Sequence, residues 1–344
     1  MDRYNISIIG SGVVGTATGK GFHKLGHNIT FFDISKQRLM ILREEGYSVA
    51  SSLKDAISRS DISFVCVNTP QTSYNNSNSN NKSYSSNNNI SNNVNDSIND
   101  GLYPIDEDLG KHQDLSQLLS ALRDIADVLN DNIINKRHIL AFRSTMLPGT
   151  MRNVILDYLE ANCNLKRGKD YDVLYNPEFL RQHTALEDFF TPDRIVIGQD
   201  VPGTSSPLSN LYSPLTKNII LTGYEEAEMA KYASNCFLAL KISYFNEIGM
   251  LCKRMGINEE QVSLAVSMDN RIGNYGTRGG RPFGGACFPK DTEAFASFVK
   301  KMNVKPDLVE TAISINEEMG GMNSTELYVK KQLAKDCCIK EPEI

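Results

Sequence analysis

The stretch ISIIGSGVVGTATGKGF, residues 6–22, combines a short apolar run with closely spaced glycines. The run at 6–9 has the composition of a buried strand, and the residues after Gly15 are compatible with a helix. In such a strand–turn–helix unit, Gly10 makes the tight turn, Gly12 lets a pyrophosphate approach, and Gly15 lets the helix pack on the strand. The stretch therefore predicts a dinucleotide-binding fold, with a tight turn that holds no cofactor as the alternative.

A second strand, expected at 28–32, ends at an acidic residue, Asp33. A carboxylate at this place suits the 2′-hydroxyl of an NAD ribose and would repel the 2′-phosphate of NADP. We therefore expect NAD as the cofactor.

Length and composition are those of an ordinary globular protein. The 344 residues allow roughly two domains. The net charge of −5 gives no electrostatic footprint for nucleic acid. Seven cysteines at irregular spacing argue against a disulfide framework and for a reducing, cytoplasmic location. No signal peptide, transmembrane run or metal-binding cluster is expected.

The first 70 residues alternate between expected strands and helices, which is typical of a parallel sheet. Strands are expected at 5–9, 28–32 and 62–67, and helices at about 13–25, 35–45 and 52–58. An Asn- and Ser-rich tract follows at 71–100, with almost no apolar residues to bury. We interpret 71–104 as a disordered, inert insertion, with a mobile flap over the site as the alternative.

The α/β pattern then resumes and gives way to helices. Strands are expected at 138–145, 171–179 and 193–198, and helices at 113–130, 149–161, 258–267, 290–302 and 306–318. A helical pattern of about thirty residues begins near residue 224 and exceeds the usual globular length, which favours a strut or a subunit interface. We predict an α/β fold: a Rossmann-type parallel-sheet NAD-binding domain (1–223), a long helix leading into an all-helical dimerisation domain (224–320), and a tail (321–344).

Cys287 lies in the segment FGGACFPKD, residues 283–291. Pro289 fits the first turn of a helix, so Cys287 is expected at the helix N-terminus, where partial positive charge favours a thiolate. Asp291 would lie near it across the first turn. A thiolate beside a carboxylate suits covalent catalysis. The alternative is a buried, inert cysteine.

Two residues of the long helix, Lys231 and Asn235, are four positions apart and share a face. A lysine and an asparagine there could stabilise an oxyanion, whereas a solvated surface lysine is the alternative. Glu178 and Arg181 follow a strand end in NPEFLR. Glu178 could serve as a general base or only as a helix-start acid.

A glycine-rich loop at 270–285 carries Arg271, Arg278 and Arg281. Arginines in such a loop suit phosphate or carboxylate recognition. The alternative is a solvated basic loop.

The chain resembles the nucleotide-sugar dehydrogenases, the UDP-glucose/GDP-mannose dehydrogenase family, over nearly its whole length outside the Asn-rich tract. The matching segments keep the family's order: GSGVVG (10–15), NTP (68–70), ST (144–145), NPEFLR…ALEDF…PDRIVIG (176–198), AEMAKYASNCFLALKISYFNEI (227–248), RIG (271–273) and FGGACFPKD (283–291). The pattern is more similar to the UDP-glucose branch than to the N-acetyl-sugar branch, with the GDP-mannose type as the alternative.

The resemblance implies a four-electron oxidation of UDP-glucose to UDP-glucuronate by two NAD in succession, through a thiohemiacetal and a thioester on Cys287. It implies that Lys231 and Asn235 stabilise oxyanions and that Asp291 supports proton transfer. It also implies that Glu178 is the base for hydrolysis of the thioester and that Thr145 helps to place the water.

The resemblance also implies a set of binding residues and no metal. Those for the cofactor are Gly10, Gly12, Val13, Val14, Gly15, Asp33, Thr69, Pro70 and Thr145. Those for the substrate are Glu178, Phe179, Leu180, Arg181, Lys231, Asn235, Arg271, Phe283 and Gly284. Arg271 would reach the substrate of a neighbouring subunit in a homodimer formed through the long helix.

Two departures from the family pattern bear on activity. Gln182 stands where the family often has a second glutamate, and the sequence to Ile344 shows no sign of the family's second α/β, nucleotide-sugar-binding domain, which we expect to be lacking. A weak enzyme is therefore expected, because remote binding energy contributes to rate. The rival interpretations are a two-electron relative of the 3-hydroxyacid dehydrogenases and an NAD-binding remnant without activity.

Overall fold

The computed structural model describes residues 3–70, 113–131, 136–285, 287–323 and 326. These residues divide into two compact units. Unit 1 ends at Lys231, and unit 2 begins at Tyr232 and also includes Pro70 and Gln113. The boundary falls within one continuous helix, α9 (Tyr224–Met255). The expected insertion and most of the expected tail lie outside the described residues.

Unit 1 is built on one eight-stranded sheet of order β3-β2-β1-β4-β5-β6-β7-β8. Its strands are β1 (Asn5–Ile9), β2 (Asn28–Phe32), β3 (Ser48–Val49), β4 (Ile62–Val65), β5 (His138–Phe142), β6 (Tyr171–Tyr175), β7 (Ile195–Gly198) and β8 (Ile219–Thr222). The predicted parallel pairing is confirmed for β1 to β6. β7 instead runs antiparallel to β6 and parallel to β8, because the connection from β6 stays at the end where β6 finishes.

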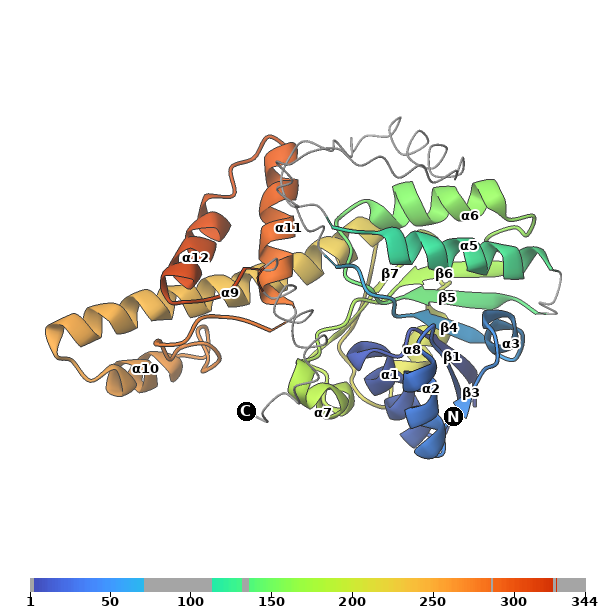
Figure 1. Cartoon of the computed structure of the whole chain (residues 1–344), viewed down its shortest axis with the longest axis horizontal. Helices are drawn as coiled ribbons and strands as arrows, with labels where there is room; N and C mark the ends of the chain where they lie inside the picture. Colours follow the sequence, from blue (N-terminus) through green and yellow to red (C-terminus); the bar gives the residue numbers. More distant parts are fainter. Residues whose placement is uncertain (1–2, 71–112, 132–135, 286, 324–325, 327–344) are drawn as a thin grey trace, which may run out of the picture. The chain divides into compact units, whose positions relative to one another are not determined.

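Helices cover both faces of this sheet, as a doubly wound fold requires (Figure 1). One face carries α1 (Val13–Lys24), α2 (Lys36–Glu44), α7 (Ala185–Phe190) and α8 (Ser206–Tyr212). The other carries α3 (Leu53–Ser58), α5 (Ser116–Asn130), the π-helical turn η1 (Met151–Leu156), α6 (Asp157–Asn162) and the start of α9. A short 3₁₀ turn, η2 (Gln182–Thr184), precedes α7.

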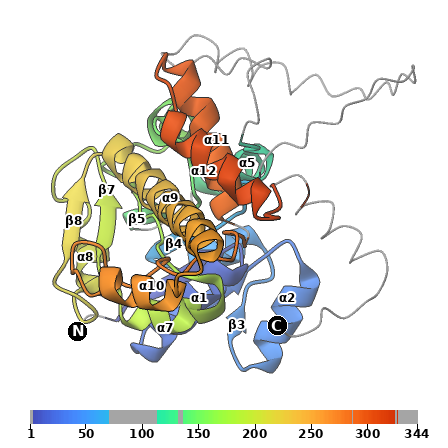
Figure 2. The ribbon, with the colours of Figure 1, turned by 90° about the vertical axis from the view of Figure 1, so that its left-hand side faces the viewer.

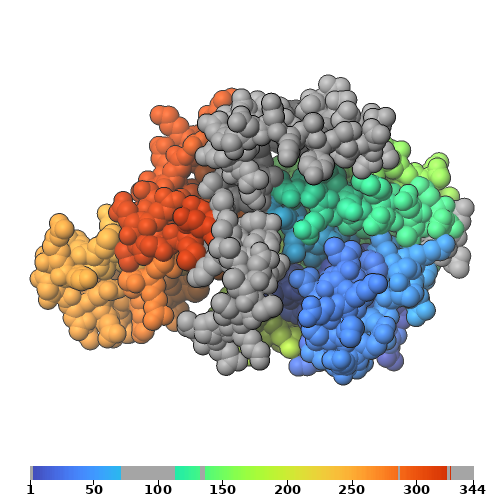
Figure 3. Space-filling model, in the orientation of Figure 1, coloured from blue at the N-terminus to red at the C-terminus, as the bar shows by residue number. Residues whose placement is uncertain are grey.

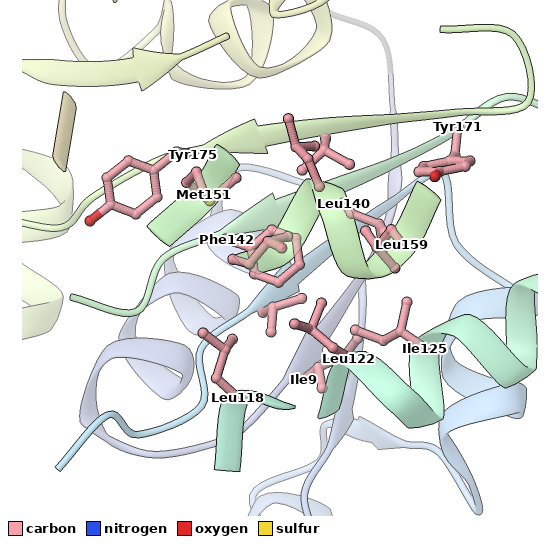
Figure 4. Packing of buried hydrophobic residues seen from close by; sticks show 14 of the residues in the cluster. Ile9, Leu118, Leu122, Ile125, Leu140, Phe142, Met151, Leu159, Tyr171 and Tyr175 are labelled. Carbon is pink, nitrogen blue, oxygen red and sulfur yellow. The ribbon is translucent and has the colours of Figure 1, made fainter. Parts of the chain in front are cut away.

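The second face holds the larger apolar cluster. Leu118, Leu122 and Ile125 of α5 point toward Leu140 and Phe142 of β5 (Figure 4). The i, i+4, i+7 spacing of the α5 residues places them on one helix face, so the apolar period found in the sequence is the period of the contact. In the space-filling view, atoms of α5 form part of the surface that faces the viewer (Figure 3).

Unit 2 consists of the rest of α9 with α10 (Glu259–Ser267), α11 (Phe288–Lys301) and α12 (Asp307–Glu318). α10 lies along the C-terminal part of α9 (Figure 2), where a Cβ on Gly249 would come 3.1 Å from the Glu259 carboxyl group. The predicted helices of this region are confirmed to within two residues at each end. Among the described residues, no helix is both long and apolar enough to cross a membrane.

Polar side chains form a buried network between the central strands. Ser7 and Ser63 hydroxyls lie 2.6 Å apart on β1 and β4, and Ser63 Oγ lies 2.8 Å from His138 Nε2 on β5. His138 Nδ1 lies 3.2 Å from the Ser60 carbonyl oxygen, which can only accept, so Nδ1 carries a proton. Burial lowers the pKa of His138 from 6.5 to about 4.

This network predicts an acid-sensitive step in stability. Between pH 6.5 and 4 the unfolded chain takes up a proton on His138 that the folded chain does not, so the free energy of unfolding falls as the pH falls through this window, by about 3 kcal/mol. His138→Gln should remove that part of the pH dependence in urea titrations at pH 7 and pH 4. The exposed His183→Gln is the control, and equal pH dependence in all three proteins would contradict the assignment.

Candidate active site

In the glycine turn after β1, Gly10 and Gly15 are packed against other backbone atoms, whereas Gly12 faces open space. Gly10 has φ of +91°, and a Cβ there would lie 2.8 Å from the Cys66 carbonyl oxygen. A Cβ on Gly15 would lie 2.0 Å from the Gly10 carbonyl oxygen. Because glycine has no Cβ, α1 can pack closely against the turn that follows β1. A Cβ on Gly12 would meet only Asn68 Oδ1, at 4.0 Å. The open space at Gly12 would let the pyrophosphate of a dinucleotide approach the backbone.

Asp33 is buried at the end of β2 and is tied to the glycine turn. Its carboxylate accepts hydrogen bonds from Ser11 N at 2.6 Å and Ser35 N at 2.8 Å. Arg38 NH1 lies 3.5 Å away, a partner that the sequence analysis missed although it stands in the first turn of the next predicted helix. Val13, in the first turn of α1, is exposed. The carboxylate is thus placed beside the turn, as recognition of a ribose hydroxyl requires.

The segments that follow β4 and β5 are joined by side-chain hydrogen bonds. Thr69 Oγ1 donates to the Thr145 carbonyl oxygen at 2.7 Å, and Ser144 Oγ donates to the Val67 carbonyl oxygen at 2.6 Å. These segments leave the carboxyl ends of adjacent parallel strands, the edge at which ligands bind in such sheets. Val14 is half-buried and Pro70 is the last described residue before the gap.

Glu178 and Lys231 form a buried ion pair within unit 1. Lys231 Nζ donates to Glu178 Oε1 at 2.8 Å and to the Glu178 carbonyl oxygen at 2.6 Å. The two side chains are 6% and 3% exposed, so the interpretation of Lys231 as a solvated surface lysine is wrong. Glu178 Oε2 also accepts from Leu180 N at 2.6 Å. The pair therefore holds α9 against the segment that follows β6.

The neighbours of Glu178 differ in their surroundings. The Phe179 ring has the Arg194 guanidinium 3.9 Å from its centroid and Lys231 Nζ at 5.4 Å. Arg181 is exposed and pairs with Asp188 at 2.5 Å. Phe179 is thus a second contact of Lys231, whereas Arg181 is engaged by its own turn and the next helix.

A second group of predicted residues meets within unit 2. Asp291 is fully buried and accepts from Asn235 Nδ2 at 2.6 Å and from Lys290 Nζ at 2.5 Å. Cys287 caps α11, and its carbonyl oxygen accepts the first backbone bond, from Asp291 N at 2.8 Å. Cys287 is exposed, so the interpretation of it as a buried cysteine is wrong. The structure thus presents the thiol at a helix N-terminus.

The backbone of the loop before Cys287 is held by side chains of α9 and α12. Asn316 Oδ1 accepts from Phe283 N at 2.6 Å, and Lys241 Nζ donates to the Ile272 carbonyl oxygen at 2.5 Å. Gly284 has open space where a Cβ would stand. Arg271 is exposed and pairs with Asp269 of its own turn at 2.6 Å, while Arg278 and Arg281 are exposed as well.

Sequence analysis missed the buried acid Glu228. It lies one turn before Lys231, and its two oxygens accept from Gly149 N and Met151 N, both at 2.7 Å. Burial raises its pKa to about 8, while the two backbone N–H groups act in the opposite direction. The sequence feature that could have revealed Glu228 is an acidic residue at an apolar position of the long helical pattern. Among the described residues, no group of His, Cys, Asp and Glu is arranged to hold a metal ion.

Comparisons with known proteins show which families this chain is similar to. Models of the UDP-glucose/GDP-mannose dehydrogenase family match residues 103–216, as the NAD binding domain, and residues 225–318, as the central domain. The model of the coenzyme F420-dependent NADP oxidoreductases matches residues 5–87.

Relatives named as nucleotide-sugar dehydrogenases match most of the chain. The UDP-glucose 6-dehydrogenase AglM of Haloferax volcanii is 30% identical over 91% of this chain and 69% of its own length. The GDP-mannose 6-dehydrogenase of Pseudomonas putida is 30% identical over 96% and 72%. The structure of a UDP-glucose dehydrogenase from Pyrobaculum islandicum has a TM-score of 0.73 at 30% identity, over 92% and 68%. The chain thus spans about two thirds of the length of these proteins.

The buried pair predicts strong energetic coupling. Lys231→Met should lower the free energy of unfolding by about 3 kcal/mol, because it leaves the Glu178 carboxylate buried without its cation. The double variant Lys231→Met, Glu178→Gln should lose less than the sum of the single losses, measured by chemical denaturation. The exposed pair of Lys54 and Asp131 is the control. A double-mutant cycle with Lys54→Met and Asp131→Asn should show little coupling energy between these two residues. Additive losses at Lys231 and Glu178 would contradict the pair.

Proposed function

The chain belongs to the UDP-glucose/GDP-mannose dehydrogenase family, and from that membership we propose that it oxidises the CH₂OH group of UDP-glucose to the carboxylate of UDP-glucuronate. It is an NAD-dependent oxidoreductase. NAD, when bound, accepts a hydride. The chemistry proposed for this chain therefore concerns how its own residues orient the sugar, hold its intermediates and move protons.

One observation carries the proposal: Cys287 is an exposed cysteine at the N-terminus of α11. Oxidation of an alcohol to an aldehyde needs no thiol. An aldehyde, however, has no second hydride to give until a nucleophile adds to its carbonyl carbon. A thiolate supplies that nucleophile, and the helix N-terminus favours the thiolate. The cysteine therefore supports a four-electron oxidation over a two-electron one.

The proposed reaction balances in three stages. The C6 alcohol loses a hydride and a proton and becomes an aldehyde. The Cys287 sulfur then forms a bond to C6, and the thiohemiacetal loses a second hydride and a proton to become a thioester. Water attacks the thioester, the C–S bond breaks, and the carboxylate leaves with the thiol restored. In sum, one CH₂OH group, two NAD⁺ and one water give one carboxylate, two NADH and three protons.

The described residues supply groups for each stage. Lys231 and Asn235, one turn apart on α9, are assigned to the oxyanions of the aldehyde and thiohemiacetal stages. Glu178 is assigned as the base that takes a proton from the hydrolytic water, with Thr145 as a group that places this water. Asp291, held by Asn235 Nδ2 at 2.6 Å, is assigned to proton transfer. A reduced thiol is needed throughout, which suits a cytoplasmic location.

GDP-mannose is the second candidate substrate. The GDP-mannose 6-dehydrogenase of Pseudomonas putida matches more of this chain than the Haloferax protein does, 96% against 91%, at equal identity. Both sugars carry the same C6 alcohol, so the assigned residues would perform the same steps. Turnover with GDP-mannose but not UDP-glucose would move the proposal to this substrate.

Cys287→Ser tests the proposed mechanism. It should lower UDP-glucuronate formation by about 100-fold or more, because a serine hydroxyl is a much weaker nucleophile at neutral pH. Affinity for NAD⁺, measured by fluorescence titration, should not change. The half-buried Cys163→Ser is the control and should keep full activity. Acid formation by Cys287→Ser at the wild-type rate would overturn the mechanism and favour a two-electron enzyme.

We also propose that the chain forms a homodimer through α9. Phe237, Tyr244 and Leu251 are 62%, 55% and 53% exposed and recur every seven residues, so they form one stripe along the helix. Large apolar side chains gathered on one face mark an interaction surface. A two-fold dimer would let each stripe cover the other.

The stripe predicts that a charge at its start separates the subunits. Phe237→Glu should give a monomer in light scattering after size-exclusion chromatography, since two buried carboxylates would face each other or their partner's apolar side chains. Leu308→Glu on α12, which is also an exposed leucine (69%), is the control and should stay dimeric. A monomeric wild-type chain would refute the dimer.

A further inference from the structure

Arg143, the first residue after β5, is a buried cation that forms no ion pair with the part of the chain that the structure describes. It is 4% exposed, and no carboxylate among the described residues lies within ion-pair distance of it. Its guanidinium instead donates to Asn176 Oδ1 and, at 2.7 Å, to the Tyr212 hydroxyl. Burying a charge in this way is costly. A residue that served only to fill space would be apolar.

The three side chains close a ring of hydrogen bonds. The Tyr212 hydroxyl, in the last turn of α8, accepts from Arg143 and donates to Asn176 Oδ1 at 2.7 Å. Asn176 Nδ2 donates to the Val196 carbonyl oxygen at 2.8 Å, and its backbone N–H donates to the Phe142 carbonyl oxygen at 2.7 Å. Asn176 therefore has its side-chain groups and its N–H satisfied by β5, β7 and α8.

This ring lies directly before two residues of the candidate site. Asn176 is followed by Pro177, whose φ is fixed by its ring, and then by Glu178. Arg143 is followed by Ser144 and Thr145. The position of Glu178, and with it the pair with Lys231, therefore depends on where Asn176 is held.

The charges of Arg143 and Glu178 also act on the same buried position. Burial raises the pKa of the Cys66 thiol to about 12, while Arg143 lowers it and Glu178 raises it. Cys66 follows β4, next to β5 in the sheet.

We propose that Arg143, together with Tyr212 and Asn176, is a positioning group that fixes the Asn176–Glu178 segment and so aims the Glu178 carboxylate. It would act through Glu178 and not touch the substrate. The expected effect of these residues on the rate of oxidation rests on the proposed function. Their effect on the order of the segment is independent of any turnover.

The test compares Tyr212→Phe and Arg143→Lys in the full chain with wild type. Tyr171→Phe is the matched control, because Tyr171 of β6 is a buried tyrosine whose hydroxyl has no hydrogen-bond partner among the described residues. Hydrogen exchange of a peptide spanning 176–181 should speed up by roughly tenfold in Tyr212→Phe, with the peptide spanning 6–22 unchanged. Exchange at the wild-type rate in both ring variants would overturn the proposal.

Kinetics separate positioning from a merely structural role. Positioning predicts that kcat of Tyr212→Phe falls by about tenfold while KM for NAD⁺ is unchanged, and that Arg143→Lys retains part of the rate. A lower melting temperature with kcat unchanged would mean a structural role only and would overturn the proposal. A wild-type chain without turnover would instead count against the proposed function, and the exchange experiment would still decide the positioning.

Discussion

The buried ion pair between Lys231 and Glu178 is the constraint on which the candidate site depends. Two opposite charges, 3% and 6% exposed, are stable inside a protein only as a pair with good geometry. The lysine lies on α9 and the glutamate follows β6, so the pair joins the long helix to the carboxyl edge of the sheet. Glu228, one turn earlier on α9, holds the N–H groups at the start of η1 in the same way.

The helix α9 in turn connects the two groups of candidate residues. Its first turns belong to the cofactor unit and its later turns to the helical unit. Lys231 faces Glu178, whereas Asn235, one turn later, holds Asp291. The helix α9 thus takes part in both compact units. Its apolar outer stripe is then available for a subunit contact.

Much of the fold could be predicted because its signals are local. The glycine turn, six of the strands and the long helix are each encoded within a few neighbouring residues. The sequence analysis missed β3, β8, α7 and α8, which have between two and seven residues and too little periodicity to detect. It identified Cys287, Lys231, Asn235 and Asp291 as candidates. It did not predict that the last three are buried, because Lys231 and its partner Glu178 are 53 positions apart, and Asn235 and its partner Asp291 are 56 positions apart. Arg143, Tyr212 and Glu228 have no sequence signal beyond being polar in apolar surroundings.

The most direct test of the central claim is the number of NADH molecules formed per UDP-glucose consumed, with the sugar limiting and NAD⁺ in excess. The proposed chemistry transfers two hydrides from one carbon, so it predicts two NADH per UDP-glucose and UDP-glucuronate as the product. One NADH per sugar, with an aldehyde as the product, would contradict the covalent role of Cys287 and leave a two-electron dehydrogenase.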